Sequence, residues 1–195
     1  MSSWIRLMAA LAVLALSGCA TVSKSECQSG DWYDIGVRDG ARGYGEERFL
    51  ENAKACAKHG LSADRERWLD GRMRGLERYC TAQNGFAVGA QNGGYAGVCP
   101  RPDDEQFLHG YRLGQDLAVA RGRVAHYDHE IHELSERLDR DRDRDEGDSG
   151  DRPKDDKRLS KAERIELAVR IGVNVAKREE ALRMVAEIED LAREL

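Results

Sequence analysis

The sequence predicts an all-α protein in which a small, disulfide-linked helical domain precedes a long helix and a C-terminal helix. Three prolines in 195 residues, with 6% aromatic residues, disfavour a β-sandwich or a collagen-like chain. Glycines recur in pairs at helical spacing, and a heptad pattern of apolar residues follows them. The length allows about one domain with extensions. The net charge of -5 argues against a general nucleic-acid-binding surface.

Residues 1–18 have the pattern of a lipoprotein signal peptide. Arg6 precedes an apolar run that is too short to cross a bilayer as a mature helix. The run ends in a Leu-Ser-Gly-Cys motif that resembles the bacterial lipobox. The resemblance implies cleavage before Cys19 and acylation of that cysteine, palmitate included, and more than one acyl chain anchors stably. Ala20, where such lipoproteins use Asp for retention in the inner membrane, then favours the periplasmic face of the outer membrane.

Residues 19–26 are expected to be a lipidated polar tether. Removal of the leader takes away one basic residue and leaves a net charge of -6. Anionic headgroups would therefore not attract the body of the protein, and the lipid supplies the membrane contact.

Four further cysteines are an even number, which suits a compartment that permits disulfides. They are Cys27, Cys56, Cys80 and Cys99. Three pairings are possible, and we favour Cys27 with Cys56 and Cys80 with Cys99 because neighbours in sequence meet most readily. Zinc sites use close C-x2-C pairs, and none of these cysteines lies closer than 19 positions to the next. We therefore expect no metal and no cofactor.

One motif recurs three times in the sequence. It consists of an aromatic residue, any two residues, a glycine, any three residues and a second glycine. The glycines are Gly36 and Gly40, Gly71 and Gly75, and Gly110 and Gly114. Residues three or four apart share a helix face, so each copy offers a bare backbone patch to a neighbouring helix. A glycine inside a helix costs about 1 kcal/mol relative to alanine. The pairs therefore predict close helix packing or a backbone-lined site.

Capping residues place several helices in the Cys/Gly-rich domain, which we assign to residues 27–106. We expect a helix from Asp31 to about Gly43, a second over residues 46–59, and a third that opens at Ser62 and runs past Cys80. The glycine-rich stretch 84–99 is expected to be a loop.

The spacing of cysteines, glycines and aromatic residues over 27–120 forms one combined pattern. Its members are Cys27, Trp32, Gly36, Asp39, Gly40, Gly43, Cys56, Asp64, Trp68, Gly71, Gly75, Tyr79, Cys80, Gly85, Gly89, Tyr95 and Cys99. This pattern resembles a family of uncharacterised proteobacterial lipoproteins defined by a domain of unknown function. The resemblance implies an envelope lipoprotein and brings no catalytic residues. A rival resemblance, to tetratricopeptide-like repeats of about 34 residues, matches the period but lacks their Ala-containing second helix.

A heptad helix is expected over residues 107–138. Its seam is Leu113, Leu117, Ala120, Val124, Tyr127, Ile131, Leu134 and Leu138, separated alternately by four and three positions. This seam either pairs with the C-terminal helix as a hairpin, which we favour, or associates through residues 113–138 with a second chain or another envelope protein.

A charged linker is expected over 139–158 and a last helix over 159–195, beginning at a capping box of Ser160 and Glu163. On that helix we expect two apolar stripes. The first is Ala168, Ile171, Val175, Leu182 and Val185, interrupted by Arg178. The second is Ala181, Met184, Ile188, Leu191 and Leu195.

Three histidines form the densest imidazole cluster, and we expect them on the outer face of the heptad helix. His126, His129 and His132 are interpreted as a solvated surface, with weak metal binding as the alternative. No phosphate loop, nucleophile elbow or haem motif occurs. The leading expectation is a non-enzymatic, lipid-anchored envelope protein with a structural or partner-binding role. The rival is a small-ligand-binding or catalytic protein that uses loop 84–99 with Tyr79, Asp70 or His109.

Overall fold

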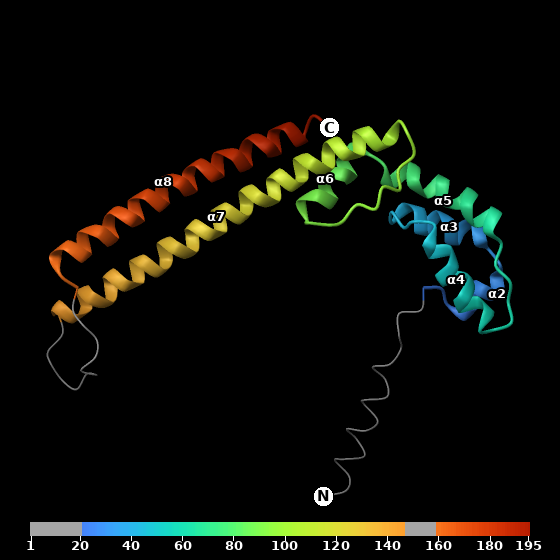
Figure 1. Cartoon of the computed structure of the whole chain (residues 1–195), viewed down its shortest axis with the longest axis horizontal. Coiled ribbons are helices and arrows are strands. Elements are labelled where there is room, and N and C mark those ends of the chain that lie inside the picture. Colours follow the sequence, from blue (N-terminus) through green and yellow to red (C-terminus); the bar gives the residue numbers. More distant parts are fainter. Residues whose placement is uncertain (1–20, 147–158) are drawn as a thin grey trace, which may run out of the picture. The chain divides into compact units, whose positions relative to one another are not determined.

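The computed structural model describes residues 21–146 and 159–195 and contains helices without strands in these ranges (Figure 1). The helices are α2 (Lys24–Ser29), α3 (Trp32–Ala41), α4 (Glu47–Ala57), α5 (Arg65–Tyr79), α6 (Ala82–Ala90), α7 (Asp103–Glu146) and α8 (Lys161–Ala192). The predicted all-α fold is confirmed. The leader and Cys19 lie outside the described residues, as does part of the expected linker, 147–158. No described helix has an apolar stretch long enough to cross a membrane.

The chain divides into two compact units, which we describe separately. The first holds the chain up to residue 81 together with residues 95–105, and the second holds residues 82–94 and the chain from 106 onward.

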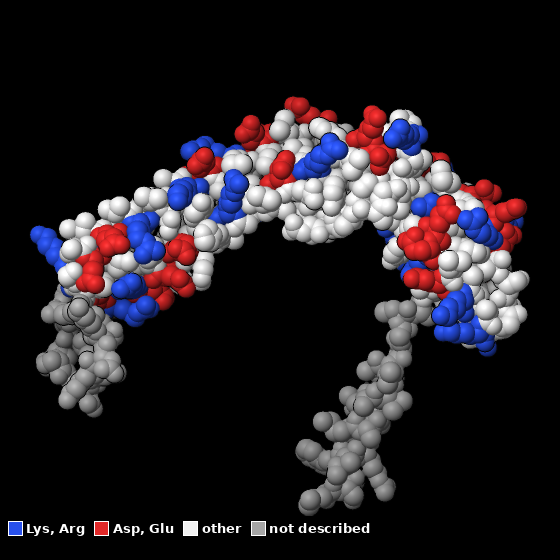
Figure 2. Space-filling model, in the orientation of Figure 1, with Lys and Arg blue, Asp and Glu red and all other residues white. Residues whose placement is uncertain are grey.

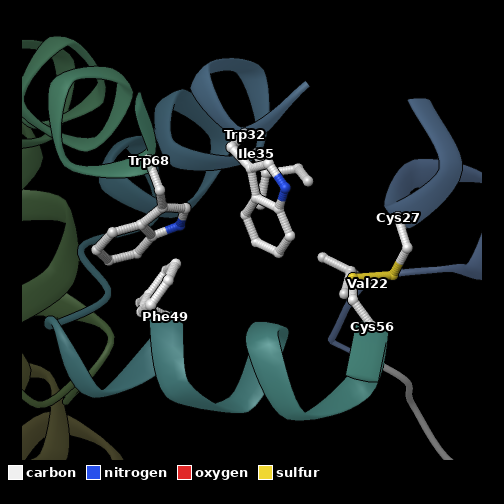
Figure 3. Close-up of a cluster of buried hydrophobic side chains, with 7 residues drawn as sticks. All are labelled: Val22, Cys27, Trp32, Ile35, Phe49, Cys56 and Trp68. Carbon is white, nitrogen blue, oxygen red and sulfur yellow. A yellow bond between two sulfur atoms is a disulfide. The ribbon is translucent and has the colours of Figure 1, made fainter. Parts of the chain in front are cut away.

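The core of the first unit is built around three aromatic rings and a disulfide (Figure 3). Phe49 of α4 lies between the two tryptophans, with ring centroids 5.9 Å from Trp32 and 5.5 Å from Trp68. The Cys27–Cys56 disulfide closes one end of this core and ties α2 to α4. A second disulfide joins Cys80 to Cys99, so the favoured pairing is confirmed.

Helix α2 replaces part of the expected tether. Ser23 caps it with a complete capping box, because its hydroxyl accepts from the Glu26 N–H while its own N–H donates to the Glu26 carboxylate at 2.7 Å. Val22 is 3% exposed and packs in the core. The chain is therefore held from residue 22 onward, and the expectation of a free tether up to residue 26 is wrong. Gly30 ends the helix in the left-handed conformation with φ of 65°.

The capping residue of α5 also differs from the expectation. The helix begins after Asp64, whose extended backbone lets its carboxylate accept from the Arg67 N–H at 3.1 Å. Ser62 lies before this cap. The helix ends at Tyr79, and Cys80 follows it as the C-cap.

The expected loop at 84–99 is wrong over its first half, because residues 82–90 form helix α6. Glycine content suggested a loop, yet Gly85 and Gly89 stand on one face of this helix and are buried. The connection to α7 begins only after Ala90, and Asn92 adopts a positive φ of 55° there.

Helices α7 and α8 form the expected antiparallel hairpin (Figure 1). Helix α7 reaches Glu146, eight residues into the expected linker, and the predicted capping box of Ser160 and Glu163 starts α8. Of the predicted α7 seam, Leu117, Ala120 and Leu134 are buried.

The α8 seam differs from the two stripes expected. The residues of this seam, all buried or half-buried, are Arg164, Leu167, Ile171, Asn174, Arg178, Ala181, Val185, Ile188 and Ala192. They form one heptad run that contains three polar residues, so apolar residues alone do not trace it.

Candidate functional site

The glycine faces of α3 and α5 pack directly against each other. A Cβ atom added at Gly36 would lie 2.1 Å from the Trp68 carbonyl oxygen, and one added at Gly40 would lie 2.1 Å from that of Arg72. The contact is reciprocal, because Cβ atoms at Gly71 and Gly75 would lie 2.0 and 2.2 Å from carbonyl oxygens of α3. Such separations are far below van der Waals contact, so only glycine fits at these positions.

Helices α6 and α7 repeat the same arrangement in the second unit. Added Cβ atoms at Gly85 and Gly89 would lie 2.1 Å from the carbonyl oxygens of Phe107 and Tyr111. Those at Gly110 and Gly114 would lie 1.9 and 2.2 Å from carbonyl oxygens of α6. The three predicted glycine pairs thus contact a neighbouring helix, and a fourth pair on α6 joins them. Sequence comparison missed it because Ala82 stands where the other copies have an aromatic residue.

Each pair of helices runs parallel at the contact. Gly36 of α3 faces Trp68 of α5, and Gly40, four residues later, faces Arg72, also four residues later. Both helices therefore advance in the same direction along the contact. When two backbones lie this close, Cα–H groups contact carbonyl oxygens. Such contacts are weak hydrogen bonds that recur at helix interfaces. The glycine faces are therefore filled by helix backbone.

A buried carboxylate forms the polar centre of the first unit. Asp39 is 1% exposed, and its Oδ2 accepts hydrogen bonds from Asn52 Nδ2 at 2.7 Å and from Trp68 Nε1 at 3.0 Å. Arg48 Nε lies 4.0 Å from its other oxygen. A buried carboxylate is costly unless it is hydrogen-bonded and paired, and here it joins α3, α4 and α5 through these contacts. The sequence indicates Asp39 only as a member of the combined pattern over residues 27–120.

Two arginines contact Tyr44, in the segment between α3 and α4. Arg72 is 6% exposed and donates from Nε to the Tyr44 carbonyl at 2.8 Å. The Arg48 guanidinium lies over the Tyr44 ring, 4.4 Å from its centroid. These contacts hold the segment between α3 and α4 against α5.

Two titratable groups outside this centre have strongly shifted pKa values. The Ser23 backbone N–H, with the ion-paired Arg38 beside it, lowers the pKa of Glu26 from 4.5 to about 2. Burial and a hydrogen bond to Asp104 raise the pKa of Tyr95 to about 12. The Tyr95 hydroxyl also accepts from the Cys99 N–H at 3.1 Å, so this phenol fixes the end of the connection before α7.

The alternative prediction of a ligand-binding protein named Tyr79, Asp70 and His109 as site residues. None of the three lines the packed glycine faces. Asp70 and His109 are exposed, and Tyr79 is 9% exposed in the core. An open hollow of about 510 Å³ is lined by Gly30, Trp32 and Asp64 and by none of the eight packed glycines.

The histidine face lies on the exposed side of α7, as predicted. His129 Nε2 is 3.3 Å from a Glu133 carboxylate oxygen, and His132 Nε2 is 3.6 Å from one of Glu136. Within the described residues no cluster of histidine, cysteine or acidic side chains is arranged to hold a metal ion.

Ion pairs hold α7 and α8 together along their length. Arg178 Nε lies 2.6 Å from Asp128 Oδ1, and Arg121 lies 2.7 Å from Glu189. Where α7 ends and α8 begins, Asp141 is 3% exposed, with Arg164 Nε at 2.6 Å. The same carboxylate accepts from the Leu159 N–H at 3.0 Å. These contacts fix the register of the hairpin.

Side chains of both charge signs alternate over the visible face of the hairpin (Figure 2). Large apolar side chains also remain exposed on α8. Ile165, Val169, Val173 and Val175 are 56%, 60%, 47% and 39% exposed. The hairpin therefore presents an apolar surface that its own chain leaves uncovered in the described ranges.

These features define a class of protein: an all-helical chain with two disulfides, two parallel glycine-packed helix pairs and a long helical hairpin. Residues 31–116 match the model of a family described as a protein of unknown function (DUF2799). The match begins at the N-cap of α3 and ends two residues after Gly114, so it contains all eight packed glycines. No curated protein and no solved structure matches the chain.

Proposed function

We propose that this protein is a non-enzymatic, lipid-anchored protein of the outer membrane, facing the periplasm, whose hairpin binds a partner. The observation that carries the proposal is the α7–α8 hairpin with its exposed apolar residues on α8. Helix α8 has 32 residues, and at about 1.5 Å per residue it is roughly 48 Å long. A long, ion-paired rod with an uncovered apolar surface suits docking, because large exposed apolar patches mark interaction sites.

Three further features support the location and the absence of chemistry. The leader ends in a lipobox-like motif at Cys19. Two disulfides suit an oxidising compartment. The glycine faces are filled by helix backbone, and Asp39 is enclosed by donors that satisfy it.

The anchor is tested by labelling cells that make the full chain with radioactive palmitate. We expect label in the wild-type chain, recovered with outer membranes, and none in Cys19→Ala, which keeps its leader uncleaved. An unlabelled, cytosolic wild-type chain with reduced cysteines would refute the proposed location.

The binding role is tested by placing a photocrosslinking amino acid at exposed positions of α8. We expect adducts from Val169 and none from Glu187, an exposed residue on the same helix outside the apolar surface. Equal adduct yields at both positions would refute a specific surface.

A further inference from the structure

The amino-terminal half of α8 carries a second apolar face, opposite the one that packs on α7. Leu167 and Ile171 turn toward α7, being buried and half-buried. Ile165 and Val169 are more than half exposed, at 56% and 60%. A helix that is apolar on both sides is normally covered on both sides. One side of this helix has no cover among the described residues.

The exposed face follows the spacing of a coiled-coil seam. Ala162, Ile165, Val169, Gly172 and Ala176 are separated by three, four, three and four positions, and Ala162, Gly172 and Ala176 are exposed. Helices pair along apolar residues with this alternation. We call these five residues the outer seam. They predict a helix as the partner, lying along α8.

Gly172 lies in the outer seam and differs from the packed glycines. A Cβ atom added there would meet nothing within 4 Å, whereas the eight packed glycines each face a carbonyl oxygen at 1.9 to 2.2 Å. Glycine inside a helix is unfavourable relative to alanine. In the rest of this chain such glycine pairs admit a second helix, and the bare backbone at Gly172, with Ala176 one turn later, admits one as well.

The flanking charges identify the partner as a second copy in parallel. In a parallel coiled coil, the residue just before the first seam position of a heptad faces a residue of the other helix whose number is five higher. Lys161 of one copy then faces Glu166 of the other, and the same pair forms again by symmetry. Neither residue has an ion pair within the described chain. The next such pair places Ala168 against Val173, both uncharged.

An antiparallel pair fits worse. With Val169 opposite Gly172, Glu166 would face the apolar Val173, and Lys161 would face Leu182. Both charges would then lie against apolar side chains without compensation.

We propose that the outer seam of α8 binds the outer seam of a second copy in parallel and in register, giving a two-fold symmetric dimer. The inference rests on the proposed function, because it names the partner of the hairpin surface. A two-fold axis along paired helices keeps both copies in the same direction, as two chains anchored in one membrane require. The seam that α7 and α8 share within each chain is left intact.

The test uses the full chain in cells, with cysteine placed in the outer seam. Under mild oxidation we expect Val169→Cys to form a reducible species of twice the chain mass, because position 169 meets its own copy across the axis. Arg170→Cys is the matched control: it is one residue away, exposed and outside the seam, and we expect it to stay monomeric. A monomeric Val169→Cys chain, or an adduct of any other mass, would overturn the dimer.

Charge reversal tests the register. In the Val169→Cys background, Lys161→Glu should lower the crosslinked fraction several-fold, and adding Glu166→Lys should restore it. If neither charge change altered the crosslinked fraction, the parallel register would be overturned. It would also be overturned if Val169→Cys chains crosslinked to Gly172→Cys chains more readily than either variant crosslinked to a second copy of itself. Palmitate label without the dimer refutes this inference alone, and the dimer without palmitate label refutes the anchor alone.

Discussion

Alanine at Gly110 and at Gly122 should change stability in opposite directions, although both glycines lie in α7. A Cβ atom at Gly110 would lie 1.9 Å from the Ala82 carbonyl oxygen and 3.0 Å from the Phe86 nitrogen. Both are backbone atoms, so relief requires α6 to move away from α7 by more than about 1 Å, to reach ordinary contact distances. One at Gly122 would meet nothing within 4 Å.

The magnitudes follow from two opposing effects. Overpacking costs about 1–3 kcal/mol and occasionally more, and the clash with backbone places Gly110→Ala at the upper end. Alanine returns about 1 kcal/mol of helix propensity at either position. We therefore expect Gly110→Ala to lose about 2 kcal/mol of unfolding free energy and Gly122→Ala to gain about 0.5–1 kcal/mol.

Urea unfolding followed by far-ultraviolet circular dichroism, with both disulfides intact, measures the two variants against the wild type. The midpoint should fall for Gly110→Ala and rise for Gly122→Ala. If Gly110→Ala were as stable as Gly122→Ala, the close approach of α6 and α7 would be wrong, and the parallel glycine contact would have to be abandoned.

Two further predictions concern buried and titrating groups of the first unit. Asp39→Ala leaves the Trp68 and Asn52 donors unpaired, at about 1–3 kcal/mol each, so urea unfolding should show a loss of roughly 2–6 kcal/mol; a loss below about 1 kcal/mol contradicts the network. Because the folded-state pKa of Glu26 is lowered to about 2, its contribution is complete above pH 4.5 and disappears as pH falls toward 2. The unfolding temperature of Glu26→Gln should therefore fall less between pH 4.5 and pH 2 than that of the wild type. If the two chains lost the same number of degrees over this range, the lowered pKa of Glu26 would be refuted.

Local patterns predicted those parts of the fold in which one physical signal dominates. The α7 seam repeats without interruption, and its buried members Leu117, Ala120 and Leu134 follow it. The capping box at Ser160 starts α8 because hydroxyl and carboxylate satisfy the free N–H groups at that end. Neighbouring cysteines pair, as loop closure favours.

The remaining features depend on tertiary contacts that composition does not reveal. The low helix propensity of glycine predicts a loop where helix α6 forms, yet Gly85 and Gly89 are needed there because α7 approaches so closely. The α8 seam passes through the polar Asn174, whereas the predicted stripe uses its apolar neighbour Val175, which is 39% exposed. The role of Asp39 was invisible, since its donors come from α4 and α5.

The reciprocal glycine contacts have an evolutionary consequence. Each packed glycine faces the carbonyl three residues before its opposite glycine, so a larger side chain on one helix pushes the partner helix off both of its own glycines. Alteration at one of the eight positions therefore undoes a whole quartet, and we expect related chains to keep or lose these glycines in groups of four. Beyond residue 116 the described part of the hairpin contains no packed glycine, so we expect its length and charges to diverge more freely among related chains.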